Sequence, residues 1–117
     1  MKDFKKLIAW QKSFELAKKI YAVTREFPNE EKYGLVSQMN RAAVSIAANI
    51  AEGNGRNTDG EKVQFLGMAL GSAFELETEL LLANELGYVA GNTFEEVNAL
   101  TNEVQRIIIA LQNSFKK

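Results

Sequence analysis

The amino-acid sequence predicts an all-α protein with one domain, residues 1–117, folded as an antiparallel up-and-down four-helix bundle. Three observations predict this fold. A chain of 117 residues is long enough for one hydrophobic core and too short for two. Apolar residues recur at spacings of three and four in four separate segments, which is the pattern of amphipathic helices. Short stretches with proline, glycine or asparagine separate these segments, and short connections favour antiparallel neighbours.

The first helix is predicted over residues 8–26. Pro28 ends it, because proline lacks an N–H group and disfavours helical geometry in the residue before it. Asn29 is expected to cap the next helix. The apolar stripe expected in the core consists of Leu7, Trp10, Phe14, Ala17, Tyr21, Thr24 and Phe27. Trp10 and Tyr21 are therefore predicted to pack in the core and not to stack on nucleic-acid bases.

The second helix is predicted over residues 31–52. Its core stripe is expected to be Leu35, Met39, Ala42, Ala43, Ile46 and Ile50. Gly53 and Gly55 are expected to end it, because glycine adopts the left-handed geometry of a helix C-terminus at little cost.

Capping boxes predict where the third and fourth helices begin. Thr58-x-x-Glu61 opens the third helix, residues 58–86, which Gly87 stops. Thr93-x-x-Glu96 opens the fourth helix, residues 93–115. Core positions are expected at Phe65, Leu66, Ala69, Ala73, Leu76, Leu80 and Ala83, and at Val97, Leu100, Val104, Ile107 or Ile108, Leu111 and Phe115.

Several features predict contacts between helices or subunits. Gly67 and Gly71 lie four apart in the third helix, where each costs up to about 1 kcal/mol relative to alanine, and close helix crossing would offset that cost. Consecutive apolar residues at 80–82 and 107–109 point in more directions than one core requires. We therefore expect the protein to associate with copies of itself.

The composition excludes much chemistry. The chain has no cysteine and no histidine, so it has no thiolate nucleophile, imidazole base or Cys/His zinc site. We predict no catalytic residue, no metal and no cofactor, and hence no enzyme. The apolar stretch near the start is too short for a signal peptide, and no run has the length of a membrane span. A cytoplasmic protein without a membrane partner is expected.

The charges are segregated along the chain. Residues 1–25 carry seven Lys/Arg against two acids, whereas residues 52–103 carry ten acids against two bases, and the whole chain has a net charge of −1. Solvated helix faces explain this pattern most simply. Two alternatives are complementary charge between neighbouring subunits and a basic strip that meets an anionic partner.

The segment 49–56 is the most distinctive in the chain. It combines Asn49 and Glu52 with the turn residues Gly53 and Gly55 and with Arg56. Arg56 and the glycine loop could hold a phosphate, but the Walker Gly-Lys-Ser/Thr ending is missing. We therefore expect Glu52 and Arg56 to brace each other or a neighbouring subunit.

An acidic edge is expected on the third helix. Glu75 and Glu79 are predicted to form a solvated or subunit-facing edge that meets Lys18 or Lys19. Without histidine, a di-metal site there is not supported.

The landmarks taken together resemble the 23S rRNA intervening-sequence proteins, or S23-type family. They are Trp10-Gln11-Lys12, Phe27-Pro28, Tyr33-Gly34-Leu35, Ser37-Gln38, Arg41-Ala42-Ala43, Ser45-Ile46, Asn49-Ile50-Ala51-Glu52-Gly53, Gly55-Arg56, Phe65-Leu66, Gly71-Ser72, Glu75-Leu76-Glu77 and Leu86-Gly87-Tyr88. The resemblance implies a four-helix protomer and, for several members, a ring-like homopentamer. A related branch resembles the accessory protein of diversity-generating retroelements, a basic pentamer that binds nucleic acid and a reverse transcriptase.

Two functions follow as hypotheses. The first is a non-enzymatic homopentameric scaffold for a protein partner, with Asn49, Glu52, Gly53, Gly55, Gly67, Gly71 and Glu75 in structural or subunit contacts. The second is an accessory protein that binds RNA or DNA through Lys5, Lys6, Lys12, Arg41 and Arg56, with several weak contacts adding up in a ring.

Overall fold

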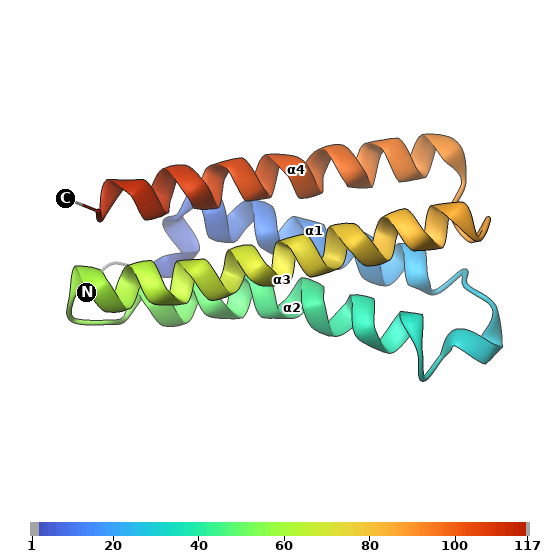
Figure 1. Ribbon diagram of the computed structural model, residues 1–117, viewed down its shortest axis with the longest axis horizontal. Coiled ribbons are helices and arrows are strands. Elements are labelled where there is room, and N and C mark those ends of the chain that lie inside the picture. The colour runs from blue at the N-terminus through green and yellow to red at the C-terminus, as the bar shows by residue number, and fades with distance from the viewer. Residues whose placement is uncertain (1–2, 117) are drawn as a thin grey trace.

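The computed structural model describes residues 3–116 and confirms the four-helix bundle (Figure 1). The long helices are α1 (Ile8–Thr24), α2 (Leu35–Asn54), α3 (Asp59–Glu85) and α4 (Gly91–Ser114), with short 3-10 turns η1 (Phe4–Lys6) and η2 (Asn29–Glu31). Consecutive helices run in opposite directions, so both ends of the chain lie at one end of the bundle. Each helix packs on its two neighbours, with α1 between α2 and α4 and therefore diagonally opposite α3.

The helix termini differ in part from those predicted. Thr58 caps α3 as expected, accepting a hydrogen bond from the Glu61 N–H at 3.1 Å. Gly87 follows α3 with a φ of +78°, the left-handed geometry that favours glycine. The Thr93 cap is wrong, because α4 already begins at Gly91 and has no side-chain cap.

The start and end of α2 also correct the prediction. Residues 29–31 form η2, so Asn29 does not cap α2, which begins only at Leu35. There the Glu31 carboxylate accepts a hydrogen bond from the Leu35 N–H at 3.2 Å. At the other end α2 continues to Asn54, and neither Gly53 nor Gly55 is left-handed.

The predicted core is confirmed for three helices, whereas in α1 it is confirmed for Thr24 and wrong for Phe14 and Tyr21. Phe14 and Tyr21 are 47% and 45% exposed, whereas Leu16 and Ile20 are fully buried. The buried face includes Ser13, whose hydroxyl donates to the Ala9 carbonyl at 2.7 Å and so costs little to bury. The prediction assigned aromatic residues to the core, and two of these, Phe14 and Tyr21, lie at the surface. Trp10 packs partly against the core.

Glycine permits a close approach between α2 and α3 at Gly53. A Cβ atom there would lie 2.9 Å from Phe65 Cβ, a distance that real side chains do not adopt. At Gly67 the nearest atom is the Gln112 Nε2 at 3.4 Å, and at Gly71 there is open space. The prediction of close crossing within the protomer is therefore wrong for Gly71, and Gly53 has that role.

Candidate functional site

The segment 49–56 lies at the end of the bundle where α2 leads into α3. Asn49 is half-buried and donates to the Ser45 carbonyl at 2.9 Å and to Ser45 Oγ at 3.0 Å. Ser45 Oγ in turn lies 2.9 Å from Ser72 Oγ of α3. Asn49 thus belongs to a polar cluster that joins α2 to α3.

Arg56 is held on two sides. Its Nη2 donates to Glu52 Oε2 at 2.8 Å, which confirms that these two residues brace each other. Its guanidinium carbon also lies 4.5 Å from the centre of the Phe65 ring, in cation–π contact. The Arg56 Nε is buried and has no acceptor among residues 3–116. The guanidinium is consequently held in position, and its buried Nε–H group is unused.

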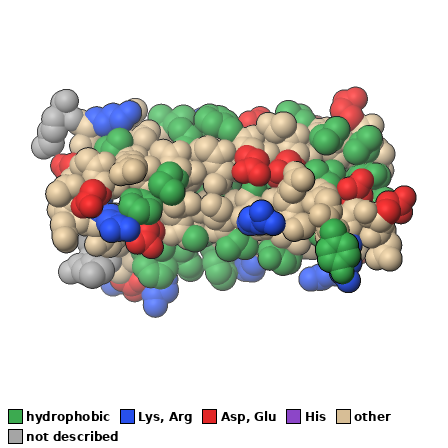
Figure 2. All heavy atoms as spheres, turned by 60° about the horizontal axis from the view of Figure 1, so that its bottom comes forward, with side chains coloured by type: hydrophobic (Ala, Val, Ile, Leu, Met, Phe, Trp, Pro, Cys, Tyr) green, Lys and Arg blue, Asp and Glu red, His purple; other side chains and the backbone are tan. Residues whose placement is uncertain are grey.

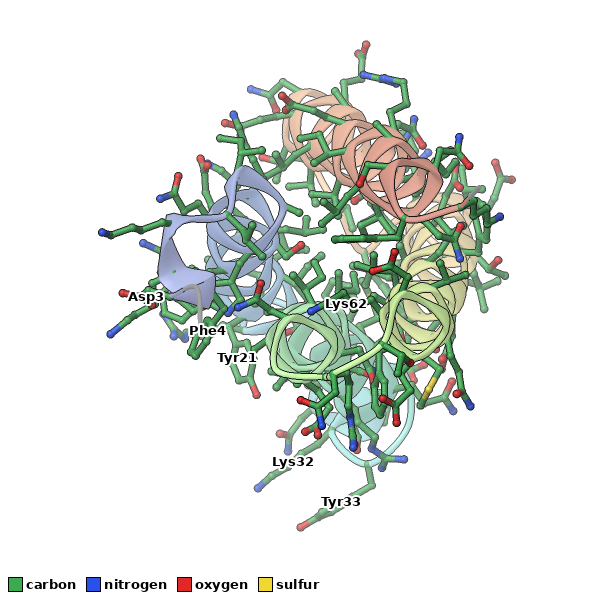
Figure 3. The ribbon with its side chains drawn as sticks, turned by 90° about the vertical axis from the view of Figure 1, so that its left-hand side faces the viewer. Asp3, Phe4, Tyr21, Lys32, Tyr33 and Lys62 are labelled. Atoms are coloured by element: carbon green, nitrogen blue, oxygen red, sulfur yellow. The ribbon has the colours of Figure 1, made fainter. Side chains whose placement is uncertain are left out.

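A pocket of about 670 Å³ opens beside Arg56. It is lined by apolar Leu7, Ile50, Leu66, Leu111 and Phe115, by polar Asn54, Arg56, Asn57, Lys62 and Ser114, and by Gly53 and Gly55. Lys62 Nζ donates to the Asn54 carbonyl at 3.2 Å and lies 5.8 Å from the centre of the Phe115 ring. Figure 3 shows Lys62 at this end of the bundle, between α2 and α3.

Most of the pocket was not recognised from the sequence. The segment 49–56 supplies one wall of the pocket. From the sequence, Lys62 is indistinguishable from other surface lysines of a helix, and Leu111 and Phe115 are predicted only as core residues. These residues meet because the end of α4 returns to the end of α2, a contact between segments more than fifty residues apart. No local pattern reports that contact.

The five cations predicted to contact nucleic acid do not form one patch. Lys5 and Lys6 are exposed in η1, at the same end as Arg56. Lys12 instead lies 3.6 Å from Glu103 of α4, and Arg41 lies on the outer side of α2.

The acidic edge of α3 is less solvated than predicted. Glu79 is only 7% exposed, and its Oε1 has no hydrogen-bond partner among residues 3–116. Burial, followed by the negative charge of Glu75 and a hydrogen bond with it, raises the pKa of Glu79 to about 7. Nothing in the local sequence distinguishes Glu79 from its exposed neighbour Glu75.

Within one protomer this edge does not meet Lys18 or Lys19. Lys19 Nζ lies 3.4 Å from Glu96 of α4, and Lys18 Nζ lies 5.7 Å from the centre of the Phe14 ring. Because α1 is diagonally opposite α3, neither lysine of the same protomer can reach Glu75.

Exposed apolar side chains lie on two outer surfaces of the bundle. Figure 2 shows apolar side chains lying among charged ones on one face of the molecule. The α1–α2 face consists of Phe14, Tyr21, Tyr33 and Val44, all at least 45% exposed. The α3 face consists of Met68, Phe74, Leu81, Leu82 and Leu86, also at least 45% exposed. Figure 3 shows Tyr21 and Tyr33 pointing outward.

A groove runs along the α1–α2 face. Its volume is about 640 Å³, and its lining includes Tyr21, Tyr33, Val36, Arg41 and Val44. The apolar surface of this face is therefore hollowed and can receive a ridge from another helix.

These features define a small four-helix-bundle protein with apolar side chains on two outer faces. Residues 5–110 match the family model of the 23S rRNA-intervening sequence protein, and the chain belongs to this family. It is similar to a solved protein of unknown function from the S23 ribosomal protein family of Bacteroides thetaiotaomicron VPI-5482. That similarity has 27% identity and a TM-score of 0.83, and it covers 90% of this chain and 98% of the other. No curated protein matches the chain.

Two further properties concern residues 3–116. Within this range no helix is long and apolar enough to cross a lipid bilayer. The same residues contain no group of three or more Asp, Glu, Cys or His side chains placed to hold a metal ion.

Proposed function

We propose that the protein is a non-enzymatic scaffold that assembles head-to-tail into a ring of identical copies, five as the family resemblance implies. The observation that carries this proposal is the presence of two different exposed apolar faces, on α1–α2 and on α3. A two-fold dimer needs one self-complementary patch, whereas two unlike patches suit the head-to-tail contacts that close into rings.

Charge complementarity supports the pairing of these two faces. Lys18 and Arg25 lie on the exposed side of α1 and form no ion pair within residues 3–116. Glu75, which is exposed on α3, likewise has no cation within the part of the chain that the structure describes. Docking α3 of one copy in the α1–α2 groove of the next brings opposite charges together and covers both apolar faces.

Gly71 fits this arrangement. It is exposed on the outer side of α3, and a Cβ atom there would meet nothing within 4 Å of the protomer. A glycine in a helix interior destabilises the helix, so its position is explained by close approach of a second chain.

The test is a charge exchange measured by size-exclusion chromatography with light scattering. Lys18→Glu combined with Arg25→Glu should convert the assembly to single chains of 13.0 kDa, and adding Glu75→Lys should restore part of the assembled mass. Arg106→Glu, the same kind of change on the exposed side of α4, is the matched control and should leave the mass unchanged.

Two results would count against the proposed ring. A wild-type protein that runs as a single chain contradicts the assembly. If the assembled mass is unchanged in the variant with Lys18→Glu and Arg25→Glu, the protein associates through other faces.

A second candidate function is an accessory protein for RNA or DNA. It is favoured by Lys5 and Lys6, which are exposed at one end and would be repeated around a ring. Binding through phosphates would weaken steeply with salt, and replacing both lysines by glutamine would reduce the salt dependence. If a structured RNA and a DNA duplex both fail to bind at low salt, this function is wrong.

A further inference from the structure

The pocket at the end of the bundle is separate from the two outer faces. Its floor is apolar, since Ile50 and Leu66 are 1% and 3% exposed. Its volume of about 670 Å³ lies within the range of about 300–1,000 Å³ that is typical of small-molecule sites. The pocket is therefore large enough for a ligand with an apolar body.

The polar side of the pocket is cationic. Arg56 and Lys62 line it, whereas no aspartate or glutamate among residues 3–116 does. Glu52 neutralises part of the Arg56 charge, but it bonds only Nη2 and is not part of the lining. Lys62 uses one of its three donors on the Asn54 carbonyl, so two remain for a ligand.

The guanidinium of Arg56 is also oriented before any ligand binds. Contact with Phe65 on one side and with Glu52 on another fixes its plane. Within residues 3–116 the guanidinium donates only through Nη2, to Glu52, so the Nη1 group keeps its N–H donors for a carboxylate oxygen. A donor whose side chain is already held loses little entropy on binding.

We propose that this pocket binds a small carboxylate with an apolar body, such as a medium-chain alkyl carboxylate. The carboxylate lies between Arg56 and Lys62, and the chain extends over Ile50, Leu66 and Leu111. A cation of the same length is rejected because it would meet two positive charges. A neutral alcohol of that length binds through the apolar walls alone and therefore more weakly.

The test is a titration of the full-length protein followed by amide chemical shifts, with octanoate, octanol and octylammonium as probes. Octanoate should bind most tightly, with shifts confined to the surroundings of Leu7 and to residues 50–66 and 111–115. Arg56→Gln and Lys62→Gln should each weaken octanoate about tenfold, the usual worth of a charge-assisted hydrogen bond. Arg106→Gln, which removes an exposed cation of α4 from outside the pocket, is the matched control and should leave the affinity unchanged.

A variant with the opposite effect sharpens the test. Glu52→Gln removes a negative charge next to Arg56 without altering the lining, so it should strengthen octanoate binding. The proposal is overturned if octylammonium or octanol binds as tightly as octanoate, if the shifts map to the outer faces, or if Arg56→Gln leaves the affinity unchanged in a protein whose melting temperature shows that it is folded. The measured mass of the assembly is independent of these results.

Discussion

Replacing Glu79 by glutamine should stabilise the protein, and the gain should grow with pH. Glu79 is 7% exposed, and burial is the main reason that its pKa rises from the ordinary 4.5 to about 7. The folded state binds this proton more tightly than the unfolded chain does. The contribution of Glu79 to the free energy of unfolding is therefore largest below pH 4.5. It is lost as the pH rises toward 7 and beyond.

The size of the effect follows from the same pKa values. A tenfold difference in proton affinity corresponds to about 1.4 kcal/mol, so ionised Glu79 costs the folded state at most about 3.5 kcal/mol at pH 9. Glutamine has nearly the shape of the protonated acid and carries no charge. The difference in unfolding free energy between Glu79→Gln and wild type should therefore be near zero at pH 4 and about 2–3 kcal/mol at pH 9.

Urea unfolding followed by far-ultraviolet circular dichroism at several pH values measures this difference. A protein concentration series separates protomer stability from association. Glu85→Gln, at an exposed position of the same helix, is the control and should change stability by no more than about 0.5 kcal/mol. Equal stability of Glu79→Gln and wild type at pH 9 would show that burial does not raise the pKa of Glu79.

Two further predictions concern helix packing and capping. Gly53→Ala should destabilise the protein by about 1–2 kcal/mol, because the new Cβ would lie 2.9 Å from Phe65 Cβ and the cost of overpacking exceeds the gain in helix propensity. Gly60→Ala, where a Cβ meets nothing within 4 Å, should instead leave stability unchanged or raise it by up to about 1 kcal/mol. If the two alanine variants change the melting temperature equally, the packing argument for Gly53 is wrong. Thr58→Ala should cost about 1 kcal/mol in urea unfolding through loss of the α3 cap, with Thr58→Ser retaining most of it; no loss in the alanine variant would show that the cap is not needed.

The fold was predictable because helix periodicity and turn residues recur throughout the chain. α1 is the exception, since it carries apolar side chains on its outer surface as well as in the core. Aromatic residues usually mark the core, and here Phe14 and Tyr21 mark the outer surface while the smaller Leu16 and Ile20 fill the interior. A protein that covers its surface with another copy gives this ambiguous pattern.

The site was predictable only where its residues are close in sequence. The ion pair between Glu52 and Arg56 spans one helical turn and follows from spacing. The pocket needs Leu111 and Phe115 from the far end of the chain, and the burial of Glu79 depends on how α3 is rotated in the bundle. Spacing along one helix does not determine either feature.

The solution mass of the protein, measured by light scattering, decides whether the proposed ring forms. Two unlike apolar faces with opposite charge predict a single species of about five times 13.0 kDa, which the pair Lys18→Glu and Arg25→Glu dissociates. A wild-type protein that remains at 13.0 kDa across the concentration range would contradict the account.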